Sequence, residues 1–127
     1  MTLKLTDESI DPAAAYDLIA KDRAGSVVFH YAVVKEQNSH DKVTTGIEYR
    51  ADGDTEGELK EIAAELTEKW KLEDVLLIRR IGRLGIGDII SLVATSSLSS
   101  EDAFAACRHG IARLKKMTTV KKQEMYG

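Results

Sequence analysis

The last helical pattern of the chain constrains the fold more than any other segment. Apolar residues recur there at intervals of three and four, the spacing of one helix face, at Ala103, Cys107, Ile111 and Leu114. Lys115 lies four residues after Ile111 and therefore continues the same stripe. Because burial of an ammonium group is costly without an anionic partner, two interpretations are open. Lys115 either points into a pocket and meets an anion there, or it lies at the rim and interacts with the helix C-terminus.

Helix and strand patterns mix along the rest of the chain. A short strand is predicted at residues 3–6, and Asp11-Pro12 begins a helix that extends to about Asp22. The inward residues of this helix are Ala15, Leu18 and Ile19. Further strands are predicted at residues 26–34, 43–50, 75–81 and 88–95.

A second helix is predicted after a capping box, with Thr55 as the cap and Glu58 reaching back to it. Its inward face carries Leu59, Ile62, Ala63, Leu66 and Trp70. The complete order is β-α-β-β-α-β-β-α followed by a tail. Because strands and helices mix without strict βαβ alternation, the order predicts an α+β sandwich.

Two stretches are predicted to be connections. Residues 35–42 are polar and predict a loop that contains His40. Gly82, Gly85 and Gly87 have a spacing that suggests a phosphate-binding loop, but a strand follows them, and a phosphate cradle needs a helix N-terminus. They therefore predict a turn with glycines at positive φ.

Composition limits the class of protein. The 127 residues fit a single domain, 1–127. The net charge of -3 argues against general nucleic-acid binding, so an anionic substrate would need a local basic site. The polar N-terminus and the absence of a run of about 18 apolar residues predict a cytoplasmic protein without a membrane segment. Cys107 is the only cysteine, and the histidines lack ligand spacing, so we expect no metal site and no cofactor.

Several segments between residues 25 and 126 share motifs, in the same order, with one known family. Gly25 to Lys35 is a glycine-led strand that ends in a basic residue, and Ile47-Glu-Tyr-Arg-Ala51 is similar to a Leu-Glu-Tyr-Glu-Ala segment. Ile78-Arg-Arg-Ile-Gly-Arg-Leu-Gly-Ile-Gly-Asp88 is similar to a His-Arg-Ile-Gly-x-Leu-x-x-Gly-Asp/Glu turn. Asp102-Ala-Phe-Ala-Ala106 matches the start of a long last helix, and Leu114-Lys115 and Lys122-Gln-Glu124 match Leu-Lys and Trp-Lys-x-Glu motifs. In these segments the chain resembles the large, catalytic subunit of molybdopterin synthase.

The resemblance implies a fold of the α/β-hammerhead type with a small extra β subdomain. It also implies a partner, a small ubiquitin-like sulfur-carrier subunit whose C-terminal Gly-Gly ends in a thiocarboxylate that enters a pocket. Sulfur would pass in two rounds to a cyclic pyranopterin monophosphate and form the dithiolene of molybdopterin. The expected assembly is a homodimer of large subunits within a heterotetramer.

By resemblance, Lys115 and Lys122 are the expected catalytic residues. Lys115 would hold the terminal carboxyl group of the partner or attack it as a neutral amine, and Lys122 would bind substrate or assist proton transfer. Lys35 would bind phosphate without the two-pronged fork of an arginine. Glu124 would orient Lys122. The remaining expected substrate contacts are Ser99, Ser100 and Gln123.

Departures from the family pattern keep other hypotheses open. Ser99-Ser100 replaces a His-Arg pair before the last helix and supplies no charge, and Lys35 replaces an arginine. The Pro-x-Trp before the second lysine is replaced by Thr119, Val120 and Lys121. The alternative is a catalytically weakened relative, a binding module that keeps the fold and the partner groove, with Lys121 and Lys122 in a solvated basic tail. A third hypothesis is a related transferase with a different anionic substrate.

Overall fold

The computed structural model describes residues 1–39 and 42–127. Helices and strands follow one another in mixed order, which confirms the α+β class. The helical elements are α1 (Pro12–Ala15), the 3-10 turn η1 (Tyr16–Leu18), α2 (Thr55–Lys69) and α3 (Ser100–Lys115). The strands are β1 (Thr2–Thr6), β2 (Ser26–Val33), β3 (Asn38–Ser39), β4 (Lys42–Ala51), β5 (Asp74–Arg80), β6 (Gly82–Gly85), β7 (Ile89–Ser97) and β8 (Val120–Tyr126).

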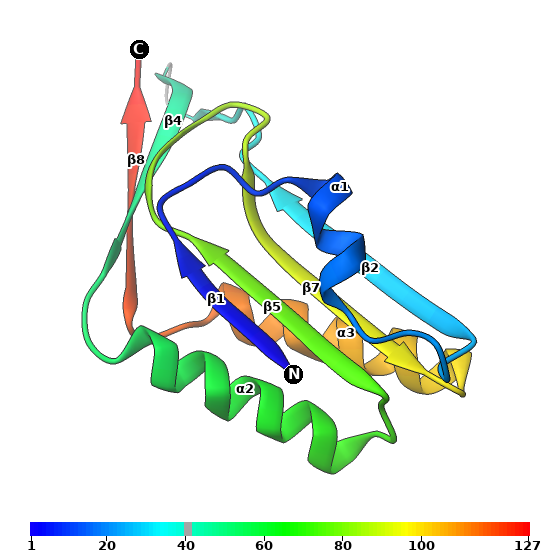
Figure 1. Ribbon diagram of the computed structural model, residues 1–127. Helices are drawn as coiled ribbons and strands as arrows, with labels where there is room; N and C mark the ends of the chain where they lie inside the picture. The colour runs from blue at the N-terminus through cyan, green and yellow to red at the C-terminus, as the bar shows by residue number, and fades with distance from the viewer. Residues whose placement is uncertain (40–41) are drawn as a thin grey trace.

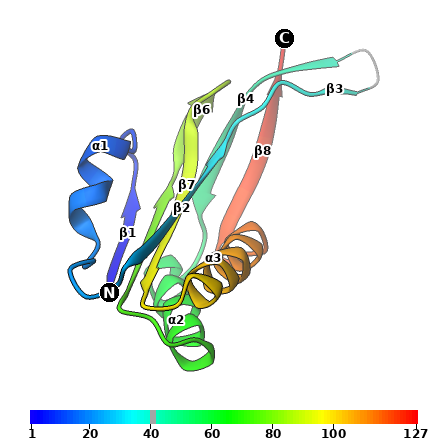
Figure 2. The same cartoon turned by 90° about the vertical axis from the view of Figure 1, so that its right-hand side faces the viewer.

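A four-stranded sheet in the order β1-β5-β7-β2 forms the centre of the fold. β1 runs parallel to β5, and the other neighbouring strands are antiparallel. α2 and α3 cover one face of this sheet, and α1 lies on the other face (Figure 1, Figure 2). Alternate residues of β5 serve the two faces. Val75 and Leu77 belong to the core under α2 and α3, and Leu76 and Ile78 belong to the core under α1.

β4 is the centre of a second, smaller sheet, which projects beyond one end of the first (Figure 2). β6 pairs with one edge of β4, β8 pairs with the other edge, and β3 pairs with its first residues. Gly46 is required where β4 and β6 meet, because an added Cβ would lie 2.5 Å from the carbonyl oxygen of Leu84. This sheet corresponds to the small extra β subdomain that the resemblance implied.

Three predicted connections contain strands instead. Residues 120–126, predicted as a tail, form β8, and the glycine turn contributes β6. Gly82 and Gly87 adopt the expected positive φ, whereas Gly85 does not. The predicted loop 35–42 carries β3, and His40 lies outside the described residues. Side-chain patterns miss these strands because backbone pairing with β4, rather than hydrophobicity, defines them.

The first helix ends earlier than predicted. Asp11 caps α1 as expected, but α1 ends at its fourth residue, and η1 follows. Ile19 is then extended, and the amide of Ala20 donates a hydrogen bond to Asp74 Oδ2 at 2.8 Å. A contact with β5 therefore takes the chain out of the helix. Leu18, expected to face inward, is 43% exposed.

The start of α2 differs from the predicted capping box. Asp54, not Thr55, is the cap, and its side chain accepts a hydrogen bond from the amide of Gly57 at 2.9 Å. Glu58 does not reach back to the cap. Its carboxylate accepts hydrogen bonds from the amides and hydroxyls of Thr118 and Thr119, which connect α3 to β8. Glu58 therefore fixes the point where β8 begins.

Loss of the Glu58 carboxylate should destabilise the fold. Glu58→Ala removes the acceptor of four hydrogen bonds and should lower the free energy of unfolding by about 1–3 kcal/mol. Glu56→Ala is the matched control, because Glu56 is an exposed carboxylate in the same first turn of α2. Urea denaturation at neutral pH measures both variants. Equal destabilisation by the two substitutions would contradict the prediction.

The same hydrogen bonds give this stabilisation a pH dependence. Burial raises the pKa of Glu58, but the hydrogen bonds from Thr119 and Thr118 outweigh it and hold the pKa below its ordinary value of 4.5. A lowered pKa in the folded state contributes stability that is present above the unfolded pKa and is lost as the pH falls through the folded pKa. The stability difference between the wild type and Glu58→Ala should therefore shrink as the pH falls below 4.5.

Candidate functional site: a basic pocket between the two sheets

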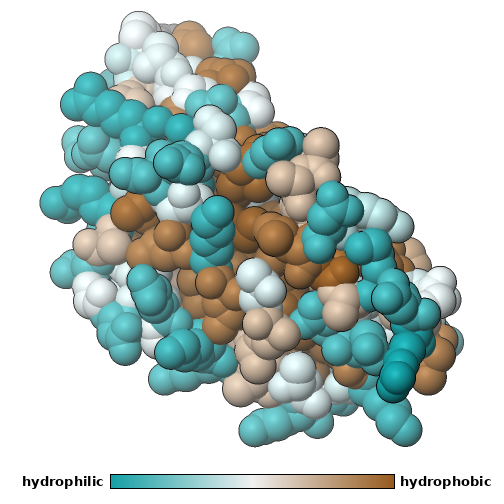
Figure 3. All heavy atoms as spheres, in the orientation of Figure 1, coloured by the Kyte–Doolittle hydropathy of each residue, from teal (hydrophilic) through white to brown (hydrophobic). Residues whose placement is uncertain are grey.

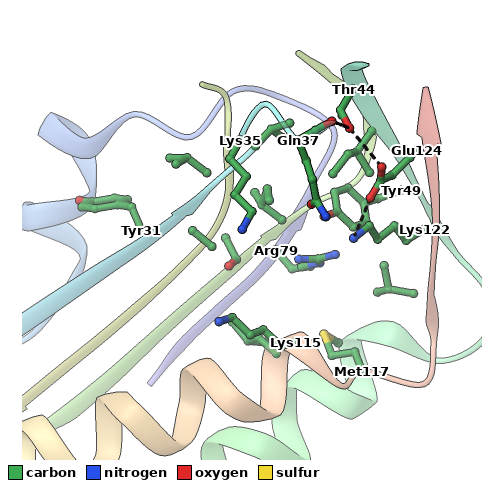
Figure 4. A pocket seen from close by; sticks show the side chains of 18 of the residues that line it. Tyr31, Lys35, Gln37, Thr44, Tyr49, Arg79, Lys115, Met117, Lys122 and Glu124 are labelled. Carbon is green, nitrogen blue, oxygen red and sulfur yellow. Dashed lines mark hydrogen bonds and ion pairs between the residues drawn. The ribbon is translucent and has the colours of Figure 1, made fainter. Parts of the chain in front are cut away.

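A cavity of about 610 Å³ opens where α3 ends and the two sheets meet (Figure 4). Its floor comes from β2, β5 and β7, and β4 and β8 form one wall. The end of α3 and the turn after it form the other wall. The described residues that line it are His30, Tyr31, Ala32, Val33, Val34, Lys35, Gln37, Thr44, Ile47, Tyr49, Arg79, Ile90, Ser91, Leu114, Lys115, Met117, Val120, Lys122 and Glu124.

The floor of the pocket continues the inward alternation of the main sheet. Val75 and Leu77 of β5 pack beneath α2 and α3, and Arg79 follows two residues later on the same side. Across the sheet, Arg79 pairs with Ser91 of β7, which pairs in turn with Ala32 of β2. All three residues of this row line the cavity. This row of paired residues lies just past the part of the sheet that α3 packs on, and it forms the floor of the cavity.

The wall formed by β8 shows the same alternation. Antiparallel pairing with β4 places Lys122 beside Tyr49, and Lys122 and Glu124 both line the pocket. Lys122 Nζ lies 3.7 Å from Glu124 Oε1. The hydroxyl of Thr44 donates a hydrogen bond to Glu124 Oε2 at 3.2 Å. Glu124 is thus held by β4 and is in position to orient Lys122.

Positive charge is concentrated in this pocket. Among the described lining residues, one carboxylate, that of Glu124, stands against four basic side chains, those of Lys35, Arg79, Lys115 and Lys122. Figure 4 shows these four side chains directed toward the same hollow from separate parts of the fold. Because the whole chain carries a net charge of -3, the pocket is a local basic site of the kind that attracts an anionic small molecule.

Lys115 lines the pocket but is not buried. The apolar stripe of α3 ends at Leu114, which is 3% exposed, and Lys115 itself is exposed at the helix end. The expectation that Lys115 continues the buried stripe is therefore wrong. Its place in the pocket lining fits the first interpretation and its exposure at the helix end fits the second, so both stay open.

Three predicted substrate contacts lie away from the pocket. Ser99 accepts a hydrogen bond from the amide of Asp102 at 3.2 Å and caps α3, and Ser100 Oγ lies 2.9 Å from Ser26 Oγ. The two serines are at the opposite end of α3 from Lys115, and a helix of 16 residues spans about 24 Å. Gln123 lies between two pocket residues of β8 and does not line the cavity. The pocket of this chain therefore brings none of the three together with the lysines.

Arg79 is a pocket residue that the sequence analysis missed. Its side chain is 6% exposed, and its guanidinium stacks on Tyr49 at 4.3 Å from the ring centroid. Burial lowers the pKa of Arg79, and contact with Tyr49 opposes this shift. The side chain stays protonated because an ordinary guanidinium pKa lies far above neutrality. The signal in the sequence was a charged residue in the inward register of an apolar strand.

His30 contributes a neutral imidazole to the pocket. Burial lowers the pKa of His30, and the positive charge of Lys115 lowers it further. The imidazole can donate and accept hydrogen bonds at neutral pH without adding to the positive charge.

Three further features of the part of the chain that the structure describes concern metal binding, membrane spanning and thiol reactivity. Within residues 1–39 and 42–127, no cluster of three or more His, Cys, Asp or Glu side chains has the geometry to hold a metal ion. None of the helices seen there has the length and apolar character needed to cross a membrane. Burial raises the pKa of the Cys107 thiol to about 11, which makes it a poor nucleophile. The basic side chains that line the pocket suit it to binding anions and stabilising developing negative charge.

Comparison with known proteins identifies the family of this chain. A family model described as MoaE protein matches residues 5–117. This chain belongs to the MoaE family. The molybdopterin synthase catalytic subunit of Vibrio cholerae is 35% identical over 119 residues, which cover 93% of this chain and 79% of that protein. The X-ray structure of molybdopterin synthase from Staphylococcus aureus is similar, with a TM-score of 0.89 and 30% identity, over 97% of this chain and 90% of that one.

A more distant MoaE-like fold occurs in a protein–protein complex. One chain in the complex of subunits 1 and 2 of the molybdopterin-converting factor from Helicobacter pylori has a TM-score of 0.73 at 11% identity. The alignment covers 98% of this chain and 84% of that one, and shows the fold alone. The resemblance found in the sequence is confirmed by the family match. That match includes Lys35, Arg79 and Lys115, whereas Lys122 and Glu124 lie beyond its end, on β8.

The placement of Lys115 near His30 can be measured directly. Lys115→Ala should raise the pKa of His30 toward 6.5, because a repelling positive charge is removed while burial remains. Lys116→Ala is the control, because Lys116 points about 100° away around the helix and should leave the pKa of His30 unchanged. NMR titration of the His30 imidazole measures the three proteins. One shared pKa value in all of them would show that Lys115 does not face His30.

Proposed function

We propose that this MoaE-family chain is the catalytic subunit of a molybdopterin synthase and acts in molybdenum cofactor biosynthesis in the cytoplasm. It takes sulfur in two rounds from the thiocarboxylated Gly-Gly terminus of a small ubiquitin-like subunit and forms the dithiolene on a cyclic pyranopterin monophosphate. The observation that carries the proposal is the convergence of Lys115 and Lys122, from different elements, on one basic pocket.

The reaction brings two anions together, the thiocarboxylate of the partner and the phosphate of the substrate. Their mutual repulsion is lowered in a site with four basic side chains. The cavity of about 610 Å³ falls in the range of about 300–1,000 Å³ that small-molecule sites occupy. Charge and size therefore support the same substrate class.

Each lysine has a proposed role that follows from its place. Lys115 lies exposed at the end of α3, where it can hold the terminal carboxyl group of the partner and stabilise negative charge as the acyl–sulfur bond breaks. Lys122, paired with Glu124, binds the substrate or assists proton transfer. Lys35 follows β2 at the rim and binds phosphate.

A second candidate is a weakened relative that binds the partner without turnover. The observation that favours it is the position of Ser99 and Ser100, which supply no charge and lie at the far end of α3. Sulfur transfer from a thiocarboxylated partner to the pterin precursor separates the two candidates. Absence of transfer by the wild type, with partner binding retained, would overturn the enzyme and leave the binding module.

Substitution of Lys115 should separate catalysis from stability. Lys115→Ala should slow sulfur transfer by about 100-fold or more, because a positive charge at the reacting group is lost. Unfolding free energy should change by less than about 0.5 kcal/mol, since the side chain is exposed. Single-turnover assays and urea denaturation measure the two effects. Lys122→Ala should weaken activity through substrate binding, as a raised KM.

The matched control is Lys116→Ala, which removes a charge one residue along the same helix end. It should leave transfer close to the wild-type rate. If Lys115→Ala and Lys116→Ala behave alike, Lys115 has only a rim role, and its assignment as the catalytic residue is wrong.

The chain is also proposed to act as one domain, 1–127, in a homodimer. β2 pairs with β7 and forms an edge of the main sheet. Apolar surface gathers in the middle of the face seen in Figure 3, and in η1 Tyr16 is 53% exposed and Leu18 43% exposed. Light scattering at tens of micromolar, on the order of a modest Kd, should give twice the chain mass of 14.0 kDa. The mass of a single chain at that concentration would count against the dimer.

A further inference from the structure

Arg79 carries a buried positive charge that the roles above do not use. It is 6% exposed, and its Nε has no hydrogen-bond partner in the described part of the chain. None of the ion pairs formed by residues 1–39 and 42–127 includes Arg79. The one carboxylate among the described lining residues, that of Glu124, already contacts Lys122 and Thr44. A buried guanidinium normally has an anionic partner, because its desolvation costs several kcal/mol.

The adjacent arginine, Arg80, differs from Arg79 because its guanidinium has a structural partner. Arg80 does not line the cavity, and its Nη1 lies 3.7 Å from Asp88 Oδ2, although its Nε also lacks a hydrogen bond. Successive residues of a strand face opposite sides of the sheet. Arg79 therefore faces the pocket and Arg80 the other side, and only Arg80 has a carboxylate.

Burial and contact with Tyr49 restrict the side chain of Arg79. One face of the guanidinium rests on the Tyr49 ring, and its strand neighbour Ser91 lines the same floor. Lys115 and Lys122 are exposed at the walls and carry their ammonium groups on flexible stems. A stacked guanidinium still presents donors along its edge, in the fork that matches two oxygens of a carboxylate or phosphate.

We propose that Arg79 is the fixed oxyanion-binding group of the pocket floor and pairs with a phosphate or carboxylate oxygen pair of an entering ligand. The identity of that ligand, the pterin phosphate or the carboxyl terminus of the small subunit, rests on the proposed function. The inference that Arg79 binds an oxyanion does not rest on the proposed function. In this arrangement Arg79 sets which anion is accepted and how it is oriented, and the exposed lysines act on a ligand already held at the floor.

The test measures binding of two probes by calorimetry at constant ionic strength. The first is inorganic phosphate, and the second is a peptide that ends in Gly-Gly with a free carboxylate, with the amidated peptide as its control. Arg79→Met keeps the volume and removes the charge, and should weaken binding of at least one probe by about 10- to 100-fold. Arg80→Met, the matched control, should bind both probes like the wild type.

Thermal unfolding without ligand gives a second readout. Arg79→Met should melt at a higher temperature than the wild type, because an unpaired buried charge is removed; a structural arginine would give the opposite shift. Arg79→Lys keeps the charge and loses the fork, so it should bind the probes more weakly than the wild type and more tightly than Arg79→Met. If Arg79→Met does not fold, wild-type affinities in Arg79→Lys would overturn the inference.

The outcomes identify the ligand and keep the two proposals separate. Loss of phosphate binding alone assigns Arg79 to the substrate phosphate, and loss of free-carboxylate peptide binding alone assigns it to the partner terminus. Wild-type affinity of Arg79→Met for both probes overturns the inference, even if sulfur transfer is intact. Absence of sulfur transfer in the wild type, with Arg79-dependent anion binding retained, overturns only the proposed function.

Discussion

The antiparallel pairing of β8 with β4 is the contact on which the site depends. Its register runs from Thr44 opposite Tyr126 to Ala51 opposite Val120. This pairing makes the charged C-terminal segment one wall of the pocket. Without that pairing, Lys122 and Glu124 would have no fixed relation to Lys115, which ends α3. Glu58 reinforces the arrangement from α2, because its carboxylate holds the threonines that begin the wall. The site is thus assembled from helix, main sheet and small sheet at one junction.

The same periodicity that builds the core also places the charges. On β5, Val75 and Leu77 are covered by helices, and the next inward residue, Arg79, lies where that cover ends. On β8, Lys122 and Glu124 are two residues apart and therefore share one face of the strand, which lines the pocket. Cations that line one pocket repel one another, and a bound anion lowers that repulsion.

Much of the fold could be predicted from periodicity, because α2, α3 and the strands of the main sheet have clear apolar faces. β8 could not, since a run with three charged residues in seven has no apolar stripe, and its strand form comes from backbone pairing with β4. Glu58 fits a capping box locally, and only a threonine pair 60 residues away overrides it. Lys115 was singled out by the Leu114-Lys115 motif of the resemblance, because its position after an apolar stripe left two interpretations open. Arg79 was missed because its exposure to the pocket depends on where α3 stops.

β8 lies at the edge of the fold, and this position affects how easily the wall of the pocket can open. β8 pairs with β4 and not with the main sheet, so its far end can detach while the cores around β5 and β7 stay intact. Such local opening costs less free energy than global unfolding. Each opening removes Lys122 and Glu124 from the pocket without a change in most of the secondary structure. Local opening of this one strand therefore displaces two of the pocket residues before the protein as a whole unfolds.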